Sequence, residues 1–199
     1  MYLRGSGNTV VSNGQSLLTI TNSSDVSIDG NIETLLDWQT VKQGIHPAMA
    51  NLAFASCFNG VTGLIKGPDL MSDYPAQEAY RQMYANCTDL QNSSRIAASQ
   101  TSYRMCSSMY NGCTNLRTLP ALEAVALEDG CYRRMFMGCS SIVLNDTYTD
   151  GDNTYRIPYR ENGSIISGNP LDSMFGSTSG NVTIPNLDTD YYTPNTIIE

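Results

Sequence analysis

The chain has 199 residues, of which 41% are hydrophobic and only 15% are charged, and its net charge is −8. This composition is too apolar for disorder and predicts a folded chain with a polar but mostly uncharged surface. The 11 basic residues form no cluster beyond Arg133 and Arg134, so we expect no nucleic-acid binding. No run approaches the roughly eighteen apolar residues of a membrane span, so we expect no membrane insertion.

Residues 1–45 are predicted to form a small β-rich N-terminal cap. They contain β-branched runs at 8–12 and 17–21 and an alternating run at 26–30, separated by Asn-Gly and Ser-Ser-Asp turn signals. We expect these runs to pair as antiparallel strands and to cover the end of a stacked core. The chain starts in predicted strand, with no signal peptide, which suggests a piece of a longer protein or a mature form.

The central part of the chain, from about residue 46 to 148, repeats with a period of 26 residues. Four segments align without gaps, and they begin at Cys57, Met83, Met109 and Met135. A fifth, degenerate copy places Met174 one period plus 13 residues after Met135. Repetition at a fixed period is the mark of a stacked array, in which each unit buries its apolar face against its neighbours.

Each repeat combines a helical and a strand pattern. In the fourth copy Tyr132, Met135, Phe136 and Cys139 lie at i, i+3, i+4 and i+7, which predicts one face of a helix. The apolar run at 142–144 follows directly and predicts a short strand. We therefore expect an α/β fold in which residues 46–199 form a leucine-rich-repeat-like solenoid of short parallel strands and helices.

The extra 13 residues of the last step lie within 146–170 and predict a hairpin insertion at about 149–169. Two runs, 155–159 and 164–167, flank an Asn162-Gly163 turn signal. Insertions in repeat proteins loop out from one face and often carry the contact surface. The Pro-interrupted segment 182–199 is predicted to be an extended C-terminal cap.

Two segments, CYRRMFMGCSSI at 131–142 and MYNGCTNLRTLPAL at 109–122, resemble a known family. They look like the BspA-like leucine-rich-repeat surface proteins of gut Bacteroidetes and of their phages, and stretches at 2–5, 30–32 and 191–196 resemble sequences flanking such repeats. The resemblance implies a right-handed α/β solenoid, an extracellular, cell-surface or virion location, and adhesion or protein binding. It supplies no catalytic residues. The chain departs from the family pattern at Val61, where the other repeats have a core cysteine.

The side chains that could carry chemistry fit structural roles better. Cys87, Cys113 and Cys139 share one repeat position and should pack as small buried hydrophobes. The alternative for Cys106 and Cys131 is a disulfide between them. The spacings of the cysteines do not match those of a metal site. The only histidine, His46, is expected to lie at the surface or at a cap. The acidic segment 146–153 fails the EF-hand pattern and is more typical of a solvated turn than of a calcium loop. We expect no cofactor and no enzymatic activity.

Two surfaces remain as candidate ligand sites. Aligned strand positions would place variable side chains on the sheet face, although unconstrained exposure gives the same variation. The predicted hairpin would present tyrosines and arginines, the usual anchors of interfaces, although hairpin packing would also use them. The candidate residues are Gln91, Arg117 and Asn145 on the sheet face, and Tyr155, Arg156, Tyr159 and Arg160 on the hairpin.

Two functions follow as hypotheses. The first is a non-catalytic recognition or adhesion module of a bacterial surface protein, which binds a host protein or glycan. The alternative is a structural or receptor-binding component of a gut phage virion, such as a tail or head fibre. Fibre proteins are typically trimers, so the alternative implies a homo-oligomer.

Overall fold

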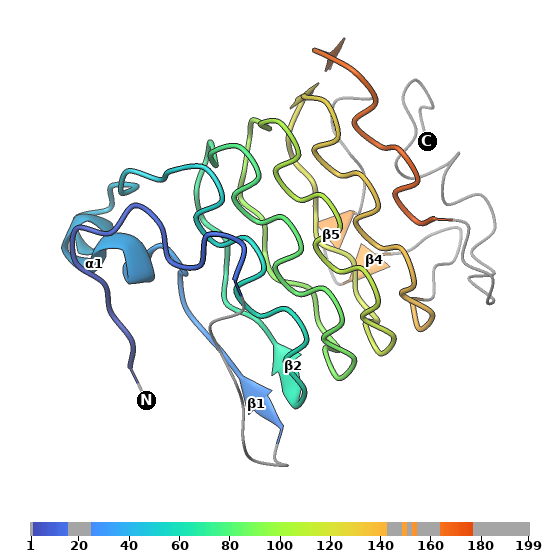
Figure 1. Ribbon diagram of the computed structural model, residues 1–199, viewed down its shortest axis with the longest axis horizontal. Helices are drawn as coiled ribbons and strands as arrows, with labels where there is room; N and C mark the ends of the chain where they lie inside the picture. The colour runs from blue at the N-terminus through green and yellow to red at the C-terminus, as the bar shows by residue number, and fades with distance from the viewer. Residues whose placement is uncertain (1, 16–24, 143–148, 151–152, 155–163, 177–199) are drawn as a thin grey trace.

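A computed structural model describes residues 2–15, 25–142, 149–150, 153–154 and 164–176. Successive coils of the chain lie side by side along its longest axis, in sequence order (Figure 1). Each coil has a turn-rich segment, and these segments are 52–61, 78–87, 104–113, 130–139 and 169–176. We call the surface that they form the turn face.

The turn-rich segments are runs of overlapping β-turns joined to their neighbours by backbone hydrogen bonds. Alternate N–H groups close turns within the segment, as Met109 N does with the Cys106 carbonyl at 3.1 Å. The others donate to the next coil, as Ser108 N does to the Arg133 carbonyl at 2.7 Å. Every fourth residue has a positive φ; in the third coil Arg104, Ser108 and Gly112 have φ values of 50°, 55° and 77°. Main-chain groups therefore fix the stacking.

The predicted helices of the repeats are wrong for these segments. Among the described residues the one α-helix is α1 (Thr34–Lys42), which precedes the repeats. The turns repeat every four residues, which is close to the 3.6 residues per turn of an α-helix. Over only eight residues, both backbones therefore bury positions i, i+3, i+4 and i+7. Half of the N–H groups bond to the next coil, so no i−4 ladder forms.

The core is a column of aligned apolar side chains. Five rings stack with centroids 5.3–5.6 Å apart, in the order Phe58, Tyr84, Tyr110, Phe136 and Phe175. The aligned Met83, Met109 and Met135 are completely buried. All six cysteines are buried free thiols, as the packing interpretation predicts. The 26-residue register thus repeats the same side-chain contacts from coil to coil.

The other side of the stack is held by short parallel pairings. Strand β1 (Val26–Ser27) pairs in parallel with β2 (Leu64–Lys66), and β3 (Ala126–Leu127) pairs in parallel with β6 (Ser164–Ile165). Isolated parallel bridges join Asn31 to Asp69, Lys66 to Asn92 and Leu70 to Ile96. No strand forms at 117–120, although Arg117 N donates to the Gln91 carbonyl at 2.9 Å.

The structure describes only part of the predicted hairpin insertion. Its expected second arm begins with β6, which instead joins the parallel pairing with β3. The expected first arm and the Asn162-Gly163 turn lie outside the described residues. A separate antiparallel pair forms between β4 (Thr149–Asp150) and β5 (Asn153–Thr154). The segment 164–176 therefore continues the stack as a fifth coil.

The N-terminal segment covers the first coil, but the expected antiparallel pairing is wrong for β1, whose partner β2 is parallel. The run at 17–21 lies outside the described residues. The covering contacts come from residues 11–14: Val11 N donates to the Ala53 carbonyl at 2.8 Å, and the Ser12 hydroxyl donates to the Ala55 carbonyl at 2.8 Å. These two carbonyl groups point away from the second coil and have no partner there. Residues 11–14 therefore supply the hydrogen bonds that the exposed end of the stack would otherwise lack.

The helix α1 is interrupted at Asp37, whose φ of −149° is not helical. Its carboxylate accepts hydrogen bonds from the N–H groups of Gly7, Gln39 and Thr40, as an N-cap does for the second half of the helix. These bonds, that of Gly7 first, lower the pKa of Asp37. Within the described residues no helix has the length and apolar character needed to cross a bilayer.

Candidate functional site

The structure brings together only part of the predicted sheet-face site. Gln91 and Arg117 are neighbours on adjacent coils, with Arg117 exposed and Gln91 half-buried. Asn145 and the hairpin residues Tyr155, Arg156, Tyr159 and Arg160 lie outside the described residues. The hairpin surface is therefore untested.

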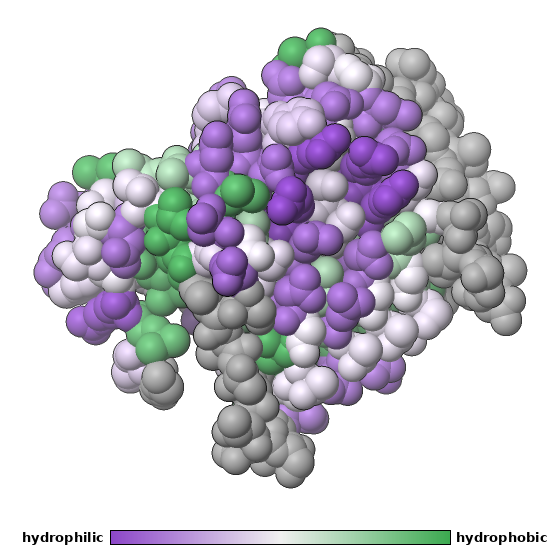
Figure 2. Space-filling view, viewed as in Figure 1, coloured by the Kyte–Doolittle hydropathy of each residue, from purple (hydrophilic) through white to green (hydrophobic). Residues whose placement is uncertain are grey.

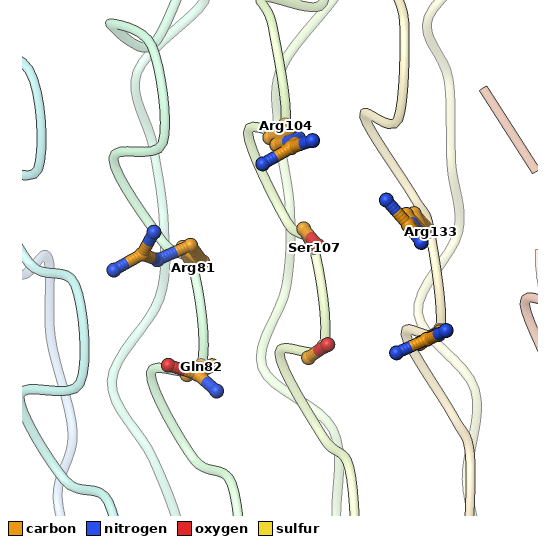
Figure 3. A pocket seen from close by; sticks show the side chains of 7 residues that line it. Arg81, Gln82, Arg104, Ser107 and Arg133 are labelled. Carbon is orange, nitrogen blue, oxygen red and sulfur yellow. The ribbon is translucent and has the colours of Figure 1, made fainter. Parts of the chain in front are cut away.

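A hollow of about 280 Å³ opens on the turn face, over the second, third and fourth coils (Figure 3). We call it the arginine hollow. Four of the chain's 11 basic residues line it, together with two serines and a glutamine: Arg81, Gln82, Arg104, Ser107, Ser108, Arg133 and Arg134.

The register of the repeat explains the shape of the hollow. Positions 81, 107 and 133 are aligned and hold Arg, Ser and Arg, and positions 82, 108 and 134 hold Gln, Ser and Arg. The third coil thus carries two short side chains between longer ones on both neighbouring coils. In Figure 3, Ser107 lies between Arg81 and Arg133, with Arg104 beyond it at one end and Gln82 towards the other.

Two of the arginines are held in place by acidic neighbours. Arg81 forms an ion pair with Glu78 of the same coil, and Arg133 Nε lies 2.9 Å from Asp172 Oδ2 of the fifth coil. Arg104 has its guanidinium 4.9 Å from the centre of the Tyr103 ring. Within the described part of the chain, Arg104 and Arg134 form no ion pair. Two of the four positive charges of the hollow therefore have no carboxylate within 4 Å among the described residues.

The lining is rich in hydrogen-bond donors. It combines guanidinium, hydroxyl and amide groups, and no acidic side chain contributes to it. Figure 2 shows strongly hydrophilic side chains gathered on this face over the middle coils. Guanidinium groups bind planar and tetrahedral oxyanions with paired hydrogen bonds. The hollow is therefore suited to a carboxylate, sulfate or phosphate group.

The cysteines lie inside the stack and away from this surface. The thiols of Cys87, Cys113 and Cys139 donate to backbone carbonyls of the preceding coil, at S···O distances of 2.8, 3.0 and 3.1 Å. Burial raises the pKa of Cys87 to about 11 and that of Cys139 to about 12. These thiols are therefore protonated at neutral pH.

The histidine lies at the N-terminal end of the stack. His46 Nδ1 is 2.8 Å from Oε2 of Glu33, whose side chain is almost completely buried. The His46 side chain is half exposed, as the surface or cap interpretation predicts. The described residues contain no group of three or more side chains placed to hold a metal ion.

The sequence interpretation missed the arginine hollow although its signal is present. Arg133 and Arg134 are noticed as neighbours along the chain, whereas Arg81 and Arg104 are far from them in sequence. Reading the repeats in register would have placed Arg81 and Arg133 in one row.

We compared the chain with protein-family models, with curated proteins and with solved structures, and none of them matches.

Proposed function

We propose that the protein is a non-catalytic recognition module that binds an anionic group of its partner in the arginine hollow. The main support is that Arg104 and Arg134 in the hollow form no ion pair among the described residues, although the chain has a net charge of −8. Burying an anion against several guanidiniums gives charge-assisted hydrogen bonds, which are stronger than neutral ones. The resemblance to BspA-like surface proteins supports the same proposal and suggests a cell-surface location.

The hollow is organised before a ligand arrives. Its walls come from three coils whose backbones are bonded to one another, and carboxylates hold Arg81 and Arg133 in place. Ligand binding then orders few additional side chains, so less of the interaction free energy is lost to entropy.

The test is titration with three anionic polymers: hyaluronan, a lightly sulfated dextran and poly-L-glutamate, at about 0.15 M salt. At least one should bind. Arg104→Gln and Arg134→Gln should each weaken that binding about tenfold, because each removes a charge-assisted hydrogen bond without breaking an ion pair of the described residues.

Arg95→Gln is the matched control, because Arg95 is exposed and does not line the hollow. It should leave the affinity within about twofold, as expected for a distant, screened charge. Failure of all three polymers to bind, or an equal loss with Arg95→Gln, would contradict the proposal. If only Arg117→Gln weakened polymer binding, the anion would bind at Gln91 and Arg117 and not in the arginine hollow.

A further inference from the structure

We infer that the arginine hollow recognises an acidic polysaccharide whose carboxylate or sulfate groups are widely spaced along the chain. This inference rests on the proposed function and specifies the class of ligand. Three features of the described residues support it: the size of the hollow, the chemistry of its surroundings and the distribution of charge.

The hollow has room for one anionic group between its walls. Arg81 and Arg133 are separated by two coil steps, for which the stacked rings give 5.4 and 5.6 Å. In Figure 3 the Arg81 side chain points away from Ser107, so an oxyanion over Ser107 would lie next to Arg133, with Arg104 at the end of the hollow. A second anion next to it would share the same arginines and meet the repulsion of the first.

The three coils that form the hollow also carry a row of exposed hydroxyl groups, one directly after each turn-rich segment. Thr88, Thr114 and Ser140 occupy one register position on the same three coils and are exposed. Ser140 Oγ donates to the Thr114 carbonyl at 3.4 Å, which shows that these two coils are adjacent here. Hydroxyls both donate and accept hydrogen bonds, so such a row can pair with sugar hydroxyls.

Apolar anchoring points are missing from the hollow. Large exposed hydrophobic side chains occur among the described residues at Tyr2, Leu3, Ile45, Tyr74, Val125 and Ile166, and none of them lines it. Protein interfaces are usually centred on aromatic or aliphatic anchors in desolvated pockets. A purely polar hollow therefore favours a glycan over a peptide.

The net charge of the chain favours sparse rather than dense anions. Two of the arginines of the hollow form no ion pair among the described residues, whereas the chain as a whole carries −8. An acidic peptide places a residue about every 3.4 Å in an extended chain, so a carboxylate bound in the hollow would have charged neighbours of the same peptide within the Debye length of about 8 Å. A polysaccharide with an acid on every second sugar or fewer avoids most of this repulsion.

The same titrations test this inference. Hyaluronan carries a carboxylate on alternate sugars, and the lightly sulfated dextran carries isolated sulfates. At least one of them should bind about tenfold more tightly than poly-L-glutamate, and unmodified dextran should not bind. Binding of hyaluronan alone assigns the hollow to carboxylates, and binding of the sulfated dextran alone assigns it to sulfates; both results support the inference.

A further variant separates recognition in the hollow from general attraction. Ser107→Leu fills the hollow and keeps all four arginines, and the aligned positions on both neighbouring coils hold long side chains, so the backbone should accept it. The preferred glycan should bind at least tenfold more weakly to a variant whose melting temperature is unchanged. Unaltered binding would overturn the inference.

Tighter binding of poly-L-glutamate than of both glycans would also overturn the inference, while leaving anion recognition intact. Equal binding of unmodified dextran would overturn it as well, since the anion would then contribute nothing. If none of the charged polymers binds, the proposed function itself fails. The two proposals can therefore fail separately.

Discussion

Single residues of the core do more than fill space. The Tyr110 hydroxyl accepts a hydrogen bond from the N–H of Ser94 at 2.9 Å, and the Tyr84 hydroxyl lies 2.8 Å from Ser94 Oγ. Both rings belong to the central stack, so their hydroxyl groups connect the turn face to the opposite side of the coil. Ser94 is buried, and these bonds satisfy its N–H and its hydroxyl group.

Tyr110→Phe should therefore destabilise the protein by about 1–3 kcal/mol, because it leaves the buried Ser94 N–H without its acceptor. Tyr80→Phe is the matched control. The Tyr80 hydroxyl is buried and has no hydrogen-bond partner among the described residues, so its removal should be neutral or stabilising. Chemical denaturation of the two variants measures both effects. Equal losses would show that the bond to Ser94 is not the cause.

Thiol chemistry gives a second test at this scale. Burial raises the pKa of Cys57 and of Cys131 to about 12, and all six cysteines are buried free thiols. A thiol-reactive dye should label the native chain slowly at neutral pH and label six cysteines rapidly once the chain is unfolded without reductant. Four labelled sites after unfolding would reveal a disulfide, for which Cys106 and Cys131 are the candidates.

At the scale of the element, one register position shows how the turns stack. Positions 60, 86, 112 and 138 hold Gly, Asn, Gly and Gly. The φ values of Gly60 and Gly138 are 72° and 81°, so alanine would be strained at both. A Cβ added at Gly138 would lie 3.3 Å from the backbone of Gly112, whereas nothing lies within 4 Å of a Cβ added at Gly60.

Gly60→Ala should cost about 1 kcal/mol, the cost of the left-handed conformation alone. Gly138→Ala should cost more, because the added methyl also presses on the neighbouring coil. Comparing the two unfolding free energies isolates the contact between coils from the backbone strain. If Gly60→Ala proves the more damaging variant, the coils do not approach each other as described.

The sequence predicts how the repeats align but not which backbone conformation they adopt. The 26-residue period defines the alignment of Met83, Met109 and Met135, and the structure buries all three. The same pattern could not distinguish a helix from overlapping turns, since both bury the same positions within eight residues. The positive φ of Ser108 and Arg134 is a further obstacle, because neither residue type favours that region.

The candidate site was harder to predict than the core. Core positions can be recognised in the sequence because apolar side chains recur there at a fixed spacing. The arginine hollow depends instead on Ser107 and Ser108 being short where the neighbouring coils have Arg and Gln, which becomes visible only when the coils are placed side by side. The predicted sheet-face residues Gln91 and Arg117 are adjacent, and their role as a ligand site stays a prediction.

At the scale of the whole molecule, the stack buries many ionisable side chains, and burial favours their neutral form. Burial is the largest cause of the raised pKa values of the cysteines and of Tyr80, Tyr84 and Tyr110. Unfolding would return each group to its ordinary pKa, 9.0 for a thiol and 10.0 for a tyrosine. The molecule thus couples its stability to alkaline pH through many groups at once.

The unfolding free energy should therefore fall as the pH rises above 9. Between the ordinary pKa and the raised one the unfolded chain binds fewer protons than the native chain, so stability decreases with pH, by up to about 1.4 kcal/mol per group per pH unit. For Cys57, Cys131 and Cys139 that window extends to about pH 12. The fall should steepen above pH 10, where the tyrosines join.

Denaturation curves from about pH 8 to about pH 11 measure this slope. The first repeat supplies the control, because Val61 occupies the register position of Cys87, Cys113 and Cys139. Replacing those three cysteines by valine should make the decline between pH 9 and 10 shallower, whatever it does to stability at neutral pH. The tyrosines remain, so the decline above pH 10 should persist. An unchanged slope between pH 9 and 10 would mean that these thiols are not buried in the native chain.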